Sequence, residues 1–153
     1  MNDAIEDDTV TFALVHHVVG PNLERDVGDH FDWLLGDSDK EHVPTWSSMM
    51  IPRSLDQSIP GCWLPDHRRH YLTYEGPVGR DRGHVNRVAW GRGYKVKNRD
   101  PDTFLYQLTD WTCDPSWTFD WPPSFRIIIS RQKLIIRSRK ASPSADSWPM
   151  LRW

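Results

Sequence analysis

Thr9–Val19 reads TVTFALVHHVV, and Asp29–Leu35 reads DHFDWLL. Both stretches are rich in β-branched and aromatic residues, which favour strands. Side chains two positions apart share one face of a strand, so His30 and Asp32 are expected to lie side by side. Burying His and Asp among apolar residues is unfavourable unless they are paired or bind a metal. The two stretches therefore predict two strands, with His17, His30 and Asp32 as candidate metal ligands.

Short strand-like segments separated by turn residues continue along the chain. The 12 Pro and 9 Gly favour many turns, and no amphipathic helix of more than about two turns is found. Arg53–Pro60 is expected to be a loop, with turns at Gly79–Gly83 and Gly91–Gly93. The further predicted strands are Pro44–Ile51, His70–Glu75, His84–Trp90, Tyr94–Lys97, Thr103–Thr109, Phe125–Ser130, Lys133–Arg139 and Trp148–Trp153. This pattern predicts an all-β fold, a small closed or partly open β-barrel of about eight short strands with few short helices.

The 153 residues suit one domain with a core of its own. We expect a flexible acidic N-terminus over residues 1–9 and a single domain over residues 10–153. The formal net charge of -2 excludes a global basic field, so nucleic acid would need a local patch. No apolar run reaches the length of about 18 residues expected of a membrane span, and the acidic N-terminus argues against a secretory signal. The expectation is a cytoplasmic protein with no membrane partner.

The two cysteines, Cys62 and Cys113, do not define a disulfide scaffold, and whether they pair is left open. Neither lies in a Cys-x-x-Cys motif, so a structural zinc site is not expected.

Three motifs follow one another in the chain. The first is Phe12–His17 followed by His30-Phe31-Asp32, the second runs from Thr45-Trp46 to Pro52-Arg53, and the third is Asp66-His67 followed by Tyr71 and Glu75-Gly76. In this order they resemble the 3′-phosphoesterase family found at the N-terminus of bacterial DNA ligase D and in stand-alone proteins. The likeness covers roughly residues 10 to 153 and is closer to the short stand-alone members.

The resemblance implies a small β-barrel enzyme that uses Mn²⁺, or Zn²⁺ or Co²⁺ in its place, to trim nucleic-acid 3′ ends in DNA repair. Members of the family remove a 3′-terminal ribonucleotide and then the remaining 3′-phosphate. The implied partners are a DNA or RNA/DNA 3′ end and a ligase or polymerase acting in trans. The family's metal ligands fall on His17, His30 and Asp32, and its catalytic residues fall on His67, Arg53 and Tyr71.

The residue types fit that chemistry. Two imidazoles and one carboxylate leave positions for water and substrate on a divalent ion, and this mixed set suits Mn, Fe, Co or Zn. His67 titrates near neutrality, so it could hold a phosphate oxygen or protonate a leaving alkoxide. Arg53 could clamp the phosphate with its planar guanidinium.

One position departs from the family. Leu34 stands where family members carry an Arg that contacts phosphate. This departure favours a second hypothesis, a module of the same fold that binds a nucleic-acid end or phosphate without turnover. If Leu34 has replaced the clamp, the positive charge must come from elsewhere. The candidates are Arg53, Arg68, Arg69, Arg80 and Arg82.

Two more hypotheses concern the histidines. His16 could take the place of His17 as a ligand, because the loop from His17 to His30 is longer than in the ligase domains and the match of His17 rests on the strand before it. His30 and Asp32 with a distal His84 have the spacing of an iron and 2-oxoacid dioxygenase. The dioxygenase hypothesis leaves His17 and His67 without a role.

Overall fold

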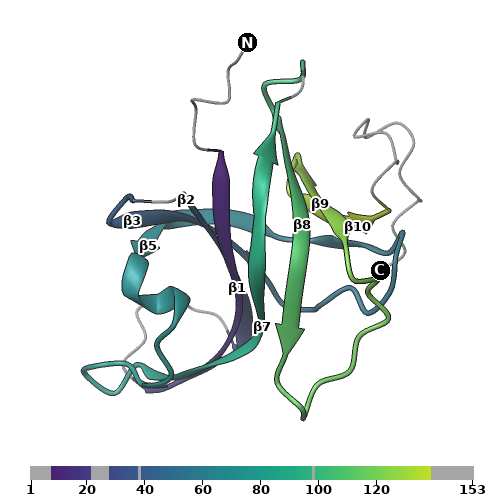
Figure 1. Ribbon diagram of the computed structural model, residues 1–153. Helices are drawn as coiled ribbons and strands as arrows, with labels where there is room; N and C mark the ends of the chain where they lie inside the picture. The colour runs from purple at the N-terminus through teal and green to yellow at the C-terminus, as the bar shows by residue number, and fades with distance from the viewer. Residues whose placement is uncertain (1–7, 22–27, 38, 98, 139–153) are drawn as a thin grey trace.

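The strands of the protein form one antiparallel sheet (Figure 1). The computed structural model describes residues 8–21, 28–37, 39–97 and 99–138. The 10 strands are ordered β4-β10-β9-β8-β7-β1-β2-β3-β5, with β6 paired to β7. They are β1 (Thr9–Val19), β2 (His30–Asp37), β3 (His42–Ser48), β4 (Ser58–Pro60), β5 (Cys62–Arg68), β6 (Gly76–Pro77), β7 (Gly83–Val96), β8 (Thr103–Cys113), β9 (Phe125–Ser130) and β10 (Lys133–Arg137), and a 3₁₀ helix, η2, spans Arg69–Leu72. The predicted all-β fold is confirmed, with more strands than the number predicted.

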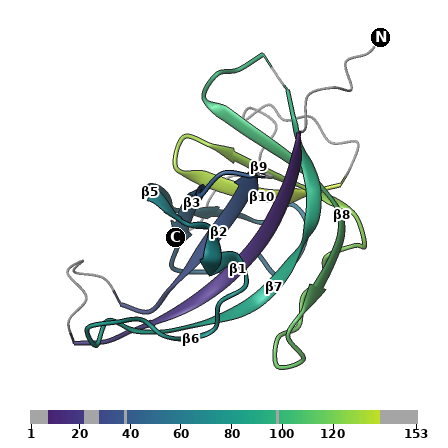
Figure 2. The ribbon, with the colours of Figure 1, turned by 60° about the vertical axis from the view of Figure 1, so that its left-hand side comes forward.

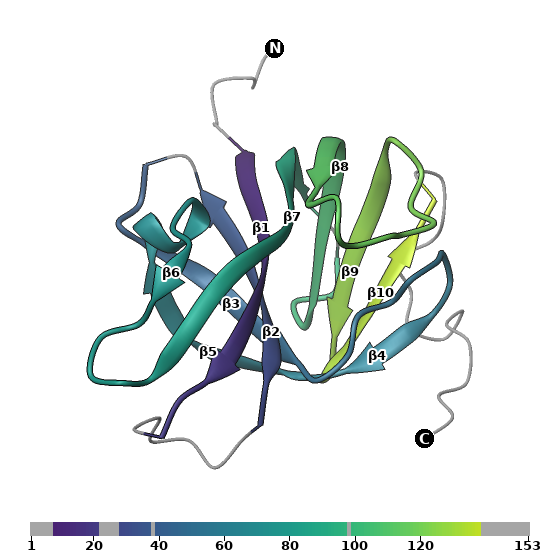
Figure 3. The same ribbon diagram turned by 90° about the horizontal axis from the view of Figure 1, so that it is seen from below.

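The two edges of the sheet are formed by consecutive parts of the chain. β4 pairs with β10 at one edge, β5 pairs with β3 at the other, and Gly61 alone separates β4 from β5. Figure 3 shows the sheet curving between these edges through β1 and β7. No ladder between β4 and β5 is found in the described part of the chain, so the sheet is not closed into a barrel.

The strands β1 and β2 present two different faces. Phe12, Leu14 and Trp33 point into the main core, which the curved sheet encloses, and there they pack with residues of β7 to β10. The opposite face carries a smaller apolar cluster. Its buried members are Ala13, Val15, Leu34, Val43, Leu72 and Val85. The three candidate ligands lie on this second face, because His17, His30 and Asp32 alternate with the core residues.

The predicted turn at Gly91–Gly93 is wrong. β7 continues through it as one strand of 14 residues and pairs with β1 on one side and β8 on the other. A Cβ at Gly93 would lie 1.9 Å from the carbonyl oxygen of Gln107. The glycine therefore permits the close approach of β8, and a register shift follows between Arg92 and Gly93.

The predicted strand His70–Glu75 is also wrong. The strand in this region is β5, which ends at Arg68, and η2 follows it directly. The region predicted as the loop Arg53–Pro60 contains the short strand β4. In contrast, β1 and β9 have the predicted bounds, and β9 and β10 form the predicted hairpin.

Three expectations concern the ends of the chain and the cysteines. The predicted strand Trp148–Trp153 and residues 1–7 of the expected flexible N-terminus lie outside the described residues. Thr9, the last residue of that expected N-terminus, already belongs to β1. Cys62 and Cys113 are both free thiols.

No helix within the described ranges has the length and apolar character that crossing a membrane would require.

Candidate metal centre

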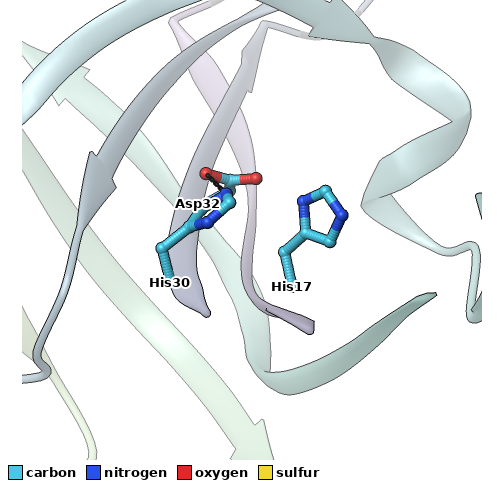
Figure 4. A group of neighbouring side chains, drawn as sticks. All are labelled: His17, His30 and Asp32. Atoms are coloured by element: carbon cyan, nitrogen blue, oxygen red, sulfur yellow. Dashed lines mark ion pairs between the residues drawn. The ribbon is translucent and has the colours of Figure 1, made fainter. Parts of the chain in front are cut away.

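The register of β1 and β2 brings the three predicted metal ligands together. His17 is the direct cross-strand partner of His30, and Asp32 follows two residues later on the same face. Their ligand atoms all lie within 4.8 Å of one another, and Figure 4 shows the three side chains gathered in one space. Two ligands on opposite sides of one divalent ion are separated by about 4.0–4.6 Å. The group is slightly wider than that, so its side chains would have to approach one another by a few tenths of an ångström to hold one ion.

All three candidate ligands are buried. His17, His30 and Asp32 are 8%, 1% and 3% exposed. The Oδ1 atom of Asp32 is buried and accepts no hydrogen bond. Buried carboxylate oxygens in folded proteins almost always have a hydrogen-bond partner or bind a metal, because desolvating them is unfavourable. Asp32 Oδ1 lies 3.5 Å from His30 Nε2, and a divalent cation could serve as a further partner for it.

Backbone carbonyls determine which nitrogen of each imidazole faces the site. His30 Nδ1 lies 3.0 Å from the carbonyl oxygen of Gly28, and His17 Nε2 lies 3.0 Å from that of Arg82. A carbonyl only accepts, so these two nitrogens carry the protons. In the neutral rings the lone pairs then lie on His30 Nε2 and His17 Nδ1. Metal-bound histidines are commonly oriented by hydrogen bonds of this kind.

A third imidazole, that of His67, reaches the same carboxylate from β5. His67 Nε2 lies 3.6 Å from Asp32 Oδ2, and His30 Nε2 lies 3.5 Å from Asp32 Oδ1. Burial by itself raises the pKa of the Asp32 carboxyl, but His30 and His67, when their rings are protonated, attract the carboxylate, outweigh the burial and hold that pKa below its ordinary value. Asp32 is therefore ionised at neutral pH, as metal ligation requires.

These side chains line a cavity of about 860 Å³. Leu34 lies in its wall, and Tyr71 from η2 also lines it, with its ring centroid 6.2 Å from that of His67. Three arginines line the cavity as well, and all three are exposed. They are Arg68, Arg80 and Arg82. The cavity thus combines a potential metal group, a titratable imidazole and guanidiniums that could contact an anion.

The structure places Arg53 outside this cavity, in disagreement with the role predicted for it. Its guanidinium lies 5.7 Å from the ring centroid of Trp117 and 5.8 Å from that of Phe119. Its Nη1 donates to the carbonyl oxygen of Thr118 at 3.3 Å. Arg53 follows β3 closely in sequence, but the chain turns toward the aromatic residues after β8, and only the tertiary fold determines this.

The hypotheses that involve His16 and His84 do not agree with the placement of the rings. His16 points to the opposite face from His17 and stacks on Phe31, with 4.7 Å between the ring centroids. His84 is exposed and does not line the cavity, so it is not positioned to complete a facial triad with His30 and Asp32.

Arg80 and Arg82 line the cavity, but the sequence did not single them out as site residues. They were two among five arginines that could supply charge, and the motif resemblance favoured Arg53 over them. The turn that carries them is separated from His17 by more than sixty residues, and its contact with the end of β1 comes from tertiary structure. No protein-family model matches this chain, and a search of the curated proteins finds no match either.

Proposed function

We propose that the protein is a divalent-metal-dependent phosphoesterase that acts on nucleic-acid 3′ ends. The observation that supports this proposal most is the convergence of His17, His30 and Asp32, with the buried Asp32 Oδ1 that accepts no hydrogen bond. The proposal also draws on the resemblance of the sequence motifs to the 3′-phosphoesterase family. Mn²⁺ is the ion proposed, with Zn²⁺ and Co²⁺ as alternatives for the same ligand set.

In this proposal each residue has a separate task. His17, His30 and Asp32 hold the ion, which when bound neutralises phosphate charge and provides a water of lowered pKa. The Nδ1 atom of His67 donates to the carbonyl oxygen of Pro65 over 3.1 Å, which orients Nε2 toward Asp32 and the cavity. A proton on Nε2 is then placed to be transferred to the leaving oxygen of the phosphoester. Tyr71 borders the same space and would contact the terminal nucleotide.

The test is an end-processing assay. The protein is incubated with Mn²⁺ and a 5′-labelled primer that ends in a 3′-ribonucleotide or a 3′-phosphate. We expect removal of either group by the wild type and at least about a hundredfold slower removal by His30→Ala, since even outer residues of metal sites contribute 10–100-fold. His42→Ala is the matched control, because His42 is exposed on β3 and does not line the cavity. If the wild type and His30→Ala are equally inert with Mn²⁺, Zn²⁺ and Co²⁺, the proposal is wrong.

A second candidate is a module that binds a nucleic-acid end without turnover. It is favoured by Leu34, which lies in the cavity wall and is 1% exposed. An apolar side chain there provides none of the transition-state charge stabilisation that an Arg would supply. Leu34→Arg tests this difference, because the long stem of Arg can lie along the apolar wall while its head group enters the cavity. Increased cleavage in the variant would support the phosphoesterase proposal, and unchanged cleavage would mean that position 34 does not face the substrate.

A further inference from the structure

We propose that the turn Gly79–Gly83 is the phosphate-binding element of the cavity, with Arg80 and Arg82 holding a terminal 3′-phosphate. This inference rests on the proposed function in assuming a nucleic-acid end as the ligand. It identifies which of the candidate arginines contact the phosphate in place of the Arg that Leu34 has replaced.

The turn is held against the strand that carries His17. The carbonyl oxygen of Arg82 accepts a hydrogen bond from His17 Nε2 at 3.0 Å, so the arginine turn also orients a metal ligand. Gly83 has a φ of 101°, and a Cβ there would lie 1.9 Å from the carbonyl oxygen of Val18. Figure 2 shows this loop between β6 and β7 beside the end of β1. The position of the arginines relative to the metal group is thus fixed by the backbone.

The conformation of the turn restricts where the arginine side chains lie. Arg80 and Asp81 have φ values of 63° and 56°, a left-handed conformation for which Gly and Asn are the favoured residues. Arg82 Nε donates to the carbonyl oxygen of Gly79 at 2.9 Å, which fixes the direction of its side chain. The same left-handed conformation occurs at Arg131 and Gln132 in the last hairpin, so it belongs to the tight turn and fixes where the Arg80 side chain begins.

The charges around the cavity favour this turn over the other arginine in the lining. Arg68 lies on β5 two residues after Asp66, and both line the cavity, so their charges offset each other. Asp81 lies between Arg80 and Arg82 in the sequence but does not line the cavity. The excess positive charge is therefore on the turn, and guanidinium groups bind phosphate in a bidentate manner that fits this role.

The test measures binding in the absence of metal, so that turnover plays no part. The probes are two single-stranded DNA oligonucleotides with a 5′ fluorescein, one ending in a 3′-phosphate and the other in a 3′-hydroxyl. Fluorescence anisotropy in EDTA gives the ratio of their dissociation constants. We expect the wild type to prefer the 3′-phosphate by about tenfold or more, as charge-assisted hydrogen bonds are worth about that factor.

Three variants make the test specific. Arg80→Gln/Arg82→Gln is expected to lose the preference, whereas Arg80→Lys/Arg82→Lys keeps the charge and is expected to retain part of it. Arg92→Gln removes the same charge from an exposed position on β7 outside the cavity, and we expect it to keep the full preference. If the double variant does not fold, the preference for the 3′-phosphate is measured on the single variant Arg80→Gln instead. Neither the Arg82 carbonyl nor its contact with His17 depends on the Arg80 side chain.

Two outcomes overturn the inference: no preference for the 3′-phosphate in the wild type, or an unchanged preference in the folded Gln variants. Its failure is distinguishable from that of the proposed function. Cleavage with Mn²⁺ that shows an unchanged KM in the Gln variants refutes the phosphate-binding turn and leaves the phosphoesterase standing. An arginine-dependent preference in a wild type that cleaves nothing refutes the enzyme and leaves the phosphate-binding turn standing.

Discussion

The two faces of the β1–β2 pair differ in what fills the space above them. On one face Trp33 packs against Phe12 and Trp121, with centroids 6.1 and 6.3 Å away, and the packing is continuous. On the other face the apolar cluster around Leu34 does not extend to His30 and Asp32, which instead line a cavity. The same alternation of side chains builds both faces. We therefore expect stability to rest mainly on the first face, whereas the second holds buried polar groups.

The largest expected effect is on the core face. Trp33→Ala removes a fully buried ring and the hydrogen bond from its Nε1 to Ser48 Oγ, so we expect a loss of about 3–5 kcal/mol in the free energy of unfolding. Leu34→Ala, one residue away on the cavity face, is expected to lose only about 2 kcal/mol, because the cavity already borders that side chain. Urea denaturation measures both values. Equal losses would contradict the division between the faces.

The next effect concerns catalysis on the cavity face. His67→Ala is expected to lower kcat for 3′-end cleavage about a hundredfold, equivalent to about 2.7 kcal/mol, because the proton donor for the leaving oxygen is removed. The affinity for Mn²⁺ is expected to change little, because His67 is not one of the three proposed ligands. Kinetics and metal titration on the same preparation measure the two properties. A kcat close to that of the wild type would remove His67 from the mechanism.

A smaller effect is expected at the turn that holds the arginines. Gly83→Ala requires a left-handed φ and places a Cβ against the backbone of β1, so we expect it to lower the free energy of unfolding by about 2 kcal/mol. Gly79→Ala is the matched control, since a Cβ there meets no atom within 4 Å. Thermal denaturation compares the two variants. Equal melting temperatures would show that the turn is not tightly held against β1.

The smallest effect is the pH dependence that arises from Asp32. Its folded-state pKa is lowered, so the ionised carboxylate stabilises the fold fully above the unfolded-state pKa of about 3.9, and this contribution is lost as the pH falls further. We expect the free energy of unfolding of the wild type to fall by about 1 kcal/mol more than that of Asp32→Asn as the pH falls below 4. Denaturation at pH 5, 4 and 3 measures the difference. Parallel curves would mean that the fold does not lower this pKa.

Much of the sheet could be predicted because its signals are local. β1 and β9 are dense in β-branched and aromatic residues, and their bounds were predicted correctly. Arg131 and Gln132, with φ values of 54° and 72°, form the predicted two-residue connection of the last hairpin. The error at Gly93 arose because glycine both forms turns and permits close packing of strands. Only the approach of β8 distinguishes the two.

The candidate site could be predicted in part for the same reason. His30 and Asp32 share a strand face by simple alternation, and His17 faces His30 once β1 and β2 pair. The distance between His67 and Asp32 depends on how β5 lies against β3, which no local pattern specifies. Arg53 was predicted at the site because of its motif, but its interactions with Trp117 and Phe119 hold it elsewhere.

The most direct test of the central claim, that the cavity face holds a metal centre, is the binding of Mn²⁺ to the metal-free protein. Electron paramagnetic resonance of free Mn²⁺ during a titration gives the number of ions bound per chain. The account predicts one tightly bound ion in the wild type and loss of that binding in Asp32→Asn. No bound ion in the wild type, or the same binding in the variant, would contradict it.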